Sequence, residues 1–288
     1  MKPEKVMLAQ AGDETKLDEM IASKNWHFEV KYDGERGMLM VSDGTAVLCN
    51  RKGKDINSQF PEIEAMGSKL PSGVYDGEIY VQINASYKDK PTTSGRTSVK
   101  PTEARILAKV KPATFMCFDV LEYEGENVEG KPYEKRKEIL ARVDNLRIPG
   151  FQGVFPEENP KEAWQQIVLS GNEGMVAKRV GSRYEHLRSF NWLKLKTWKE
   201  EDFEVVGITS EKRDISALIL NNGMKVNCSL DSEAYNRLLT DLVKTDTVFH
   251  ANDGSLGFRL KKTYKAKVKY LHKSNDGLRF PILRDLEI

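Results

Sequence analysis

The chain has 288 residues, of which 39% are hydrophobic and 31% charged, and its formal net charge is +2. The length is sufficient for two compact domains, and the apolar content excludes a disordered chain. Because basic and acidic residues nearly balance, a nucleic-acid-binding surface would have to be local rather than a property of the whole chain.

Cysteine usage and the lengths of the apolar runs argue against several further classes of protein. Cys49, Cys117 and Cys228 are odd in number and have no CxxC spacing, which argues against a disulfide scaffold and against a cysteine-built zinc site. No apolar run reaches the roughly 18 residues of a membrane helix, and the N-terminus lacks the apolar stretch of a signal peptide. We therefore expect a soluble, cytoplasmic protein (in the host cytoplasm if the source is viral), and we expect it to be a monomer.

The first 197 residues alternate between strand and helix patterns. Period-two alternation and turn residues predict strands at 26–42 (two strands joined at Asp33-Gly34), 44–56 (a pair with a glycine turn), 73–83 (strand, turn, strand), 114–123, 174–180 and 192–198. Apolar residues at helical spacing, with capping residues, predict helices over 13–24, 102–109, 159–171 and from Pro132 onward. The polar stretch 84–101 is predicted to be an exposed loop.

The sequence changes character at the charged segment 197–202, which is predicted to interrupt the strand pattern. Beyond it, short strand patterns surround one predicted helix at 231–243, and Asn222-Gly223 is a hairpin turn signal. Such a pattern over about 90 residues is typical of a small OB-type β-barrel. We therefore predict an α+β fold, with a larger domain of antiparallel sheets and flanking helices over 1–197 and an OB-type barrel over 198–288.

Residues 29–36 (EVKYDGER) carry the sharpest chemical signal in the chain. They place Lys31 at the end of an apolar strand, directly before the predicted Asp-Gly turn. Most lysines in such positions are solvated surface residues. A lysine that is partly desolvated near other cations loses its proton more readily, however, and its neutral amine can then act as a nucleophile. Taken alone, Lys31 fits both interpretations.

Six further motifs follow in a characteristic order. They are NRKGK (50–54), DGEIYV (76–81), FMCFDVLEY (115–123), EGMVAK (173–178), WLKLK (192–196) and RFP (279–281). With the lysine motif, this series resembles the covalent nucleotidyltransferase superfamily of DNA ligases, RNA ligases and mRNA capping enzymes, and it is most similar to small, virus-type ATP-dependent DNA ligases. The resemblance implies a nucleotidyltransferase (adenylation) domain followed by an OB-fold domain.

The resemblance implies that Lys31 attacks the α-phosphate of ATP, forms a lysine–AMP phosphoramidate and expels pyrophosphate. The attack needs an unprotonated amine, and a free lysine has a pKa of about 10.4. Lys194 and Lys196 alternate with leucines in WLKLK, so both point to one strand face, where they would lower the pKa of Lys31 and stabilise the phosphate's negative charge. The alternative is an amphipathic strand with two solvated lysines.

Glu78 and Glu173 each lie beside a glycine at the start of a motif. The resemblance places Glu78 near the ribose and a metal, and Glu173 near a catalytic metal and the α-phosphate. Carboxylates and phosphate oxygens form the usual shell of Mg²⁺, for which Mn²⁺ would be a substitute. The alternative is that both are ordinary turn glutamates.

Five other residues match nucleotide- or DNA-contacting positions of the superfamily. By resemblance, Phe118 stacks on adenine, although a core role is the ordinary one for phenylalanine. Arg36 would lie near the ribose, Arg51 near the 5′-phosphate of a nick, and the backbone of Glu29 near the adenine edge. Lys178 would face the phosphates or the ribose.

The C-terminal region is basic and ends in a shortened motif. Residues 259–284 contain nine basic residues and one acidic residue, and Lys265, Lys267 and Lys269 share one strand face. We predict that this face tracks a DNA backbone, while the alternative is a solvated edge strand. By resemblance, Arg279 orients the pyrophosphate of ATP, whereas the spacing of Arg284 does not fit the motif.

Taken together, the motifs predict an ATP-dependent DNA ligase that seals 5′-phosphate/3′-hydroxyl nicks in duplex DNA through a lysine–AMP intermediate. An RNA ligase or an mRNA capping guanylyltransferase is the alternative within the superfamily. A nucleic-acid-binding module without catalysis is the alternative of another class. The resemblance leaves replication, repair and recombination open as pathways, and also any partner protein and the preference among end types.

Overall fold

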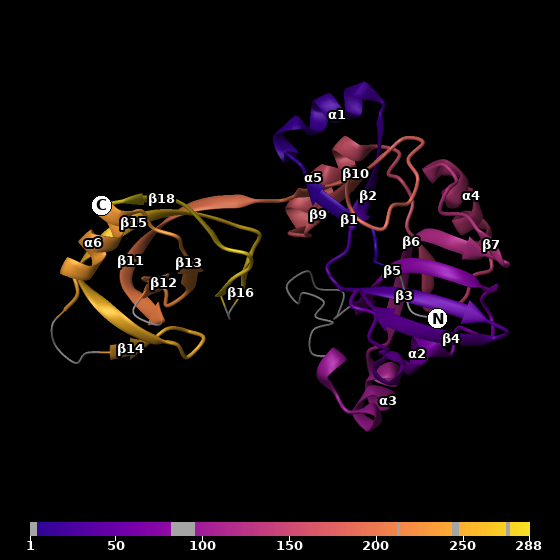
Figure 1. Cartoon of the computed structure of the whole chain (residues 1–288), viewed down its shortest axis with the longest axis horizontal. Coiled ribbons are helices and arrows are strands. Elements are labelled where there is room, and N and C mark those ends of the chain that lie inside the picture. Colours follow the sequence, from indigo (N-terminus) through magenta and orange to yellow (C-terminus); the bar gives the residue numbers. More distant parts are fainter. Residues whose placement is uncertain (1–4, 82–95, 212–213, 244–247, 275–276) are drawn as a thin grey trace. The chain divides into compact units, whose positions relative to one another are not determined.

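The computed structural model describes residues 5–81, 96–211, 214–243, 248–274 and 277–288, and the chain divides into two compact units (Figure 1). The first unit spans Met1–Lys196 and the second Thr197–Ile288, which is one residue from the boundary expected from the sequence. Most of the predicted loop 84–101 lies outside the described residues. Among the helices of the described part, none is both long and apolar enough to cross a membrane.

Four strands form the first sheet of unit 1. The cluster of Leu17, Phe28, Ile167, Met175, Ala177 and Leu195 packs α1 (Leu17–Ser23) and α5 (Pro160–Ser170) on one face of this sheet. Because side chains alternate along a strand, the residues between those apolar positions point to the opposite face. In sheet order the strands are β1 (Leu8–Ala11), β10 (Arg188–Lys196), β9 (Gly174–Arg179) and β2 (Trp26–Lys31).

The second sheet of unit 1 contains the largest core. That core includes Leu39, Tyr75, Ile79, Phe115 and Leu140, and it packs α2 (Pro61–Glu64) and α4 (Tyr133–Asp144) onto the sheet. In sheet order the strands are β4 (Thr45–Asn50), β3 (Glu35–Ser42), β5 (Gly73–Val81), β6 (Ala113–Tyr123) and β7 (Glu126–Asn127), with β8 (Phe151–Gly153) parallel to β6. The remaining helical segments are α3 (Pro101–Val110) and three 3-10 turns, Glu14–Lys16, Asn57–Gln59 and Arg96–Ser98.

The Asp33-Gly34 turn joins the two sheets instead of closing a hairpin. β2 pairs with β9 in the first sheet, whereas β3 pairs with β4 and β5 in the second. A Cβ atom on Gly34 would lie 2.2 Å from the carbonyl oxygen of Ile79, so only glycine permits this close approach. The turn thereby places Lys31, the last residue of β2, beside the second sheet.

Two sequence expectations in the second sheet were wrong. The stretch 73–83 was expected to contain a turn, but β5 runs unbroken through Gly77, where a Cβ would lie 2.7 Å from the Phe115 ring. Gly77 therefore permits close packing between strands. In the sequence, a glycine with this role looks the same as a turn glycine. In 44–56 only β4 is a strand, and its expected partner is reduced to a single bridge between Asp55 and Cys49.

The helices and the long strands were predicted well. The four helices expected in unit 1 correspond to α1, α3, α4 and α5, and Gly171 ends α5 in a left-handed conformation with φ of 68°. The predicted strands at 114–123, 174–180 and 192–198 correspond to β6, β9 and the end of β10. These segments have strong periodicity and clear capping residues, which makes them the most predictable elements.

The described residues of unit 2 form one six-stranded sheet, one two-stranded sheet and one helix. Its core includes Val205, Leu218, Leu238, Tyr264 and Val268. An OB-type barrel stays a prediction for this unit. In sheet order the strands are β13 (Lys225–Asn227), β12 (Asp214–Leu220), β11 (Lys199–Glu211), β15 (Leu256–Tyr270) and β14 (Val248–His250). The sixth strand, β18 (Ile282–Glu287), also pairs with β15. The described part is completed by the small pair β16 (Lys273–Ser274) and β17 (Gly277–Leu278) and by the helix α6 (Ser232–Thr240).

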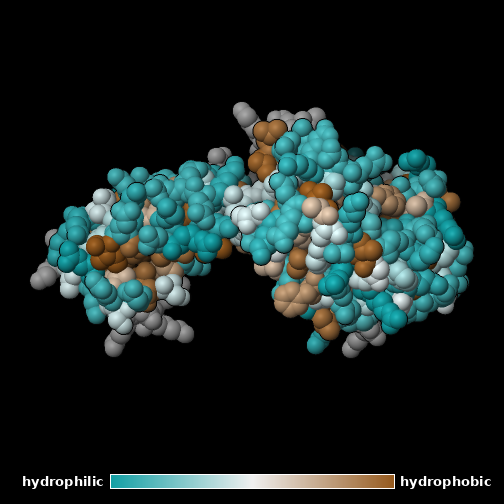
Figure 2. All heavy atoms as spheres, turned by 90° about the horizontal axis from the view of Figure 1, so that it is seen from above, coloured by the Kyte–Doolittle hydropathy of each residue, from teal (hydrophilic) through white to brown (hydrophobic). Residues whose placement is uncertain are grey.

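The charged segment 197–202 was expected to interrupt the strand pattern, and it does so only at Thr197 and Trp198, between β10 and β11. The rest of the segment forms the start of β11, where Glu200 lies opposite Lys269 and Asp202 lies opposite Lys267 in the ladder with β15. Cross-strand pairs of opposite charge stabilise such a strand, and their effect is invisible until the partner strand is known. On the face in Figure 2, hydrophilic residues predominate in both units and hydrophobic ones form small separate groups.

Candidate active site

A cavity of about 260 Å³ lies in unit 1, where the faces of the two sheets that carry the motif residues meet. Seven cationic and three acidic side chains line it, so it suits a ligand with several negative charges. All ten unit 1 residues predicted for the site line this cavity: Glu29, Lys31, Arg36, Arg51, Glu78, Phe118, Glu173, Lys178, Lys194 and Lys196.

Glu173 holds two of the predicted lysines at the cavity. Its Oε2 atom accepts a hydrogen bond from Lys31 Nζ at 2.6 Å, and its Oε1 atom lies 2.9 Å from Lys196 Nζ. Burial acts to raise the pKa of Glu173, but the two lysines outweigh it and hold the pKa below its ordinary value. In this arrangement Lys31 is a partner of a carboxylate, so it must leave that contact before its amine can attack a substrate.

Lys194 lies beside this cluster on the same face of β10. Burial, together with the nearby cations Lys196, Arg188 and Lys31, lowers the pKa of Lys194. The crowding of ammonium groups at one end of the cavity favours the binding of anions there, and phosphate oxygens are anions that lysine commonly binds in proteins.

Glu78 lies across the cavity on β5. Its Oε1 atom accepts a hydrogen bond from the Gly34 amide at 3.1 Å. Burial raises the pKa of Glu78 to about 7, although Lys31, Arg36 and the Gly34 amide favour its charged form. Perturbed pKa values cluster at functional sites, so a half-buried carboxyl in a cavity with a pKa near neutrality marks Glu78 as a functional position.

The raised pKa of Glu78 gives a stability prediction for the metal-free protein. The folded-state pKa of about 7 lies above the ordinary 4.5, so the wild-type protein loses stability as the pH rises through this range. Glu78→Gln keeps the acceptor for Gly34 and removes this penalty. The variant should be more stable than wild type by up to about 3 kcal/mol above pH 7 and equal to it below about pH 4.5.

Thermal unfolding with a chelator at about pH 5 and about pH 8 measures the difference. Glu64→Gln is the control, because Glu64 is exposed on α2 and the substitution should change neither melting temperature. A gain in the Glu78→Gln variant that is the same at both pH values would contradict the assigned pKa.

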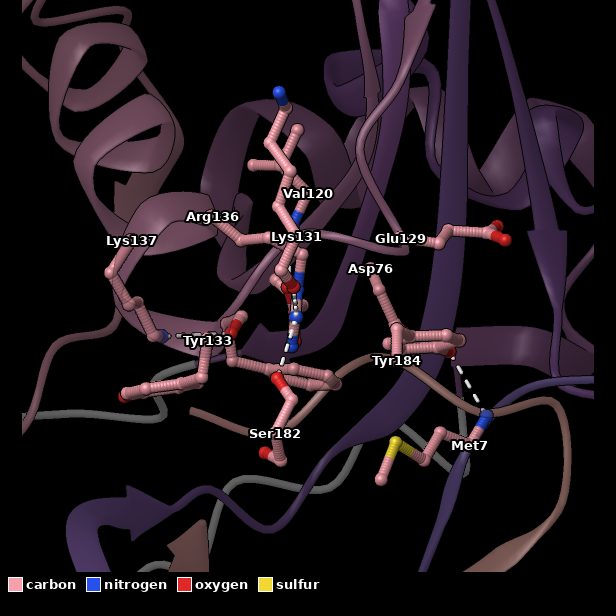
Figure 3. Close-up of polar contacts among 12 residues, drawn as sticks. Met7, Asp76, Val120, Glu129, Lys131, Tyr133, Arg136, Lys137, Ser182 and Tyr184 are labelled. Carbon is pink, nitrogen blue, oxygen red and sulfur yellow. Dashed lines mark hydrogen bonds and ion pairs between the residues drawn. The ribbon is translucent and has the colours of Figure 1, made fainter. Parts of the chain in front are cut away.

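Arg36 is fixed by residues that the sequence analysis did not single out. Its Nε and Nη2 atoms donate to the two oxygens of Asp76 at 2.8 and 2.5 Å. Asp76 also accepts a hydrogen bond from the Tyr184 hydroxyl at 2.7 Å, and that hydroxyl accepts one from the Met7 amide at 3.0 Å (Figure 3). The network ties the N-terminal segment before β1 to the second sheet and fixes the wall of the cavity.

Phe118 and Trp192 form an aromatic corner of the cavity. Their ring centroids lie 6.0 Å apart at an interplanar angle of 83°. The Arg36 guanidinium lies 4.9 Å from the centroid of the Phe118 ring, which is half-buried. An aromatic face in a cavity rich in cations suits a ligand that combines a flat base with phosphates.

Lys178 lies beneath this corner, and its predicted contact with the phosphates or the ribose stays a prediction. Its side chain is only 1% exposed, and its ammonium donates to the Phe118 carbonyl oxygen at 2.9 Å and pairs with Glu29 Oε2 at 2.9 Å. Burial lowers its pKa to about 8, although Glu29 favours the charged form. Through its ion pair with Lys178, the side chain of Glu29 holds the ammonium group at the Phe118 backbone.

The remaining predicted residues lie in unit 2. Arg279 lies in the turn before β18, and its backbone exchanges hydrogen bonds with Leu271 and His272. Arg284, on β18, has its Nε atom 3.5 Å from Glu200 Oε1. Lys265, Lys267 and Lys269 do share the outer face of β15, where Lys265 pairs with Asp202 at 3.0 Å and with Glu287 at 3.6 Å.

Several residues of the site were missed by sequence analysis. Asp76 directly precedes the Gly-Glu pair of its motif, and Trp192 has the same parity as Lys194 in β10, so both carried a usable signal. Arg188, which also lines the cavity, and Tyr184 lie in a segment without a recognisable pattern.

Within the described residues, no cluster of three or more acidic, histidine or cysteine side chains could hold a metal alone.

The fold and this cavity define a nucleotidyltransferase domain. The family described as "ATP dependent DNA ligase domain" matches residues 6–196, and the chain belongs to this family. The ligase domain of LigD from M. tuberculosis has a similar fold, with a TM-score of 0.57 at 22% identity over 99% of this chain and 95% of that one.

Two curated relatives come from Bacillus subtilis (strain 168). The chain is 27% identical over 267 residues to the bifunctional non-homologous end joining protein LigD, covering 85% of this chain and 44% of LigD. It is 29% identical over 206 residues to the SPbeta prophage-derived DNA ligase-like protein LigB, covering 70% of this chain and 72% of LigB. The chain therefore spans less than half the length of LigD and most of the length of LigB.

Proposed function

We propose that the protein is an ATP-dependent DNA ligase that seals 5′-phosphate/3′-hydroxyl nicks in duplex DNA. The convergence of Lys31, Glu173 and Lys196 at one end of a cavity that also presents an aromatic corner is the observation that carries this proposal. It combines a nucleophile with groups that bind phosphates and a base. Family membership and the relatives named as ligases support the same reaction.

In the proposed first step, the neutral amine of Lys31 attacks the α-phosphorus of ATP. The new P–N bond forms as the bond to the pyrophosphate oxygen breaks, so pyrophosphate leaves and the amine loses a proton. Lys194 and Lys196 stabilise the charge that builds on the phosphate oxygens. AMP then passes to the 5′-phosphate of the nick, where Arg51 is proposed to bind, and the 3′-hydroxyl finally displaces AMP.

The chemistry of the two carboxylates fits a bound Mg²⁺, with Mn²⁺ as a substitute. Glu78 and Glu173 line one cavity, and the phosphates of ATP and water would complete the shell, as Mg²⁺ prefers. When bound, the ion supplies charge neutralisation for the phosphates. The residues of the chain orient the nucleotide: we assign Phe118 to the adenine and Arg36 to the ribose side of the cavity.

Labelling with two nucleotides and two nicked substrates tests the proposal. ATP carrying a radioactive α-phosphate should label the protein covalently, whereas GTP labelled in the same way should not. Nicked DNA should then be sealed in preference to nicked RNA. Labelling by GTP alone would indicate a capping enzyme, and preferential sealing of RNA would indicate an RNA ligase. Either result would overturn the proposal.

We propose that unit 2 is an OB-type domain that contacts DNA through β15. The acidic residues of β11 and β18 reduce the charge of this face below what the sequence suggested, because they flank the lysines. Lys265 is paired with Asp202, whereas Lys267 makes no ion pair with residues that the structure describes. The three lysines are therefore expected to contribute unequally.

Replacing Lys265, Lys267 and Lys269 together by serine should make the salt dependence of DNA binding shallower. The slope is that of the logarithm of the binding constant against the logarithm of the salt concentration. Lys267→Ser alone should make it shallower by about one unit, as for one lost phosphate contact, and Lys265→Ser should change it by less. Titrations of nicked DNA at several salt concentrations measure these slopes. An unchanged slope in the triple variant would mean that this face is a solvated edge strand that does not contact DNA.

A further inference from the structure

Lys137 is a buried lysine that belongs to none of the seven motifs. It lies on α4, and its side chain is only 8% exposed. Its Nζ atom donates to the carbonyl oxygens of Phe118 at 2.8 Å and Val154 at 2.6 Å, and it lies 2.5 Å from Glu29 Oε1. An ammonium group has three N–H donors, so this charge is fully compensated despite its burial.

Lys137 and Lys178 share two of their partners. Both ammonium groups donate to the Phe118 carbonyl oxygen, and each pairs with one oxygen of Glu29. The Tyr133 hydroxyl donates a further hydrogen bond to Glu29 Oε1. The Lys137 ammonium lies 5.3 Å from the centroid of the Tyr133 ring, and Figure 3 shows these two side chains together. One small network thus joins α4 to both sheets directly beneath the aromatic corner.

The neighbouring residue Arg136 contacts residues outside the cavity. It binds both oxygens of Asp119 at 2.7 and 3.0 Å and also donates to the carbonyl oxygens of Lys131 and Ser182, none of which lines the cavity (Figure 3). Breaking a fully buried ion pair of this kind destabilises a fold strongly. Arg136 therefore anchors α4. Of the three polar partners of Lys137, Glu29 and Phe118 line the cavity and Val154 does not.

We infer that Lys137 is a positioning residue for nucleotide binding, acting through Phe118 and Glu29. This inference rests on the proposed function. Lys137 does not line the cavity itself, but it fixes the backbone of Phe118 and thereby the orientation of the aromatic face offered to the base. Loss of the Lys137 hydrogen bonds leaves the Phe118 backbone less fixed. It removes no group that takes part in the formation of the lysine–AMP bond.

The test separates nucleotide binding from chemistry. In single-turnover self-adenylation, Lys137→Met should raise the half-saturating ATP concentration about 10-fold and change the maximal rate by less than about twofold. Lys137→Arg keeps the charge and the donors and should recover most of the loss. Lys135→Met is the matched control: Lys135 lies on the same helix, exposed and paired only with Glu138 among the described residues, so no change is expected.

If the wild-type protein is labelled and Lys137→Met has the wild-type ATP dependence, the inference is overturned while the proposed function stands. It is also overturned if the maximal rate falls and the half-saturating concentration does not change, or if the arginine variant is no better than the methionine variant. If the wild-type protein itself is not labelled, the proposed function fails instead. Should Lys137→Met not fold, Tyr133→Phe, which removes only the hydroxyl bound to Glu29, must raise the half-saturating concentration in the same way.

Discussion

Lys31→Ala is expected to abolish covalent labelling by ATP, with a loss of at least about 1,000-fold in the rate of self-adenylation. Alanine has no nucleophile, and no other lysine of the cavity stands in the Lys-x-Asp-Gly context that distinguishes Lys31. The variant should still seal a nick supplied already adenylated, at a rate within about 10-fold of wild type, because that step does not use the amine as a nucleophile.

Lys31→Arg is the informative companion to this variant. A guanidinium retains a positive partner for Glu173 but is not deprotonated, so it should be as inactive in self-adenylation as alanine. Quantifying the covalent label on both variants, next to sealing of a pre-adenylated nick, checks the assignment. Stable labelling of either variant would mean that another residue is the nucleophile.

Arg279→Ala is expected to slow self-adenylation by about 100-fold while sparing closure of a pre-adenylated nick. A guanidinium can hold phosphate oxygens bidentately as charge builds on the leaving pyrophosphate, and a flexible ammonium is a poorer substitute. The structure supports a defined position for Arg279 within unit 2. Its backbone is bound to Leu271 and His272, and the following residue, Phe280, has a left-handed backbone with φ of 50°.

Arg284→Ala is the matched control, because Arg284 follows in β18 and its side chain is half-exposed beside Glu200. It should reduce the first step by less than about threefold. Single-turnover measurement of both steps in both variants decides the matter. If Arg284→Ala has the larger first-step defect, the register assigned to the terminal motif is wrong.

The residues of the cavity could be predicted because strand alternation is a local property. In WLKLK, the leucines pack toward α1 and α5 and the lysines must then point to the opposite face, whatever the rest of the fold does. The order of the motifs similarly identified Glu78, Phe118 and Glu173 as residues of one site. Their convergence in one cavity follows from the Asp33-Gly34 turn between the sheets.

The partners of the buried charges could not be predicted, since they come from distant segments. Lys137 reaches Glu29 from more than a hundred residues away in the chain, and nothing in the helical pattern of α4 distinguishes it from the exposed Lys135. The same limit explains two errors. Gly77 permits close packing rather than a turn, and the charges of Glu200 and Asp202 are matched by lysines across the ladder of β11 and β15, so the strand begins earlier than expected.

A pulse–chase experiment tests the central claim most directly. The protein is first labelled with ATP radioactive at the α-phosphate in the presence of Mg²⁺, then freed of nucleotide and mixed with nicked duplex DNA. We predict that the label lies on Lys31, moves to the 5′-phosphate of the nick, and is released as AMP as the strand is sealed. A label on Lys31 that never reaches DNA, or sealing without any covalent label, would contradict it.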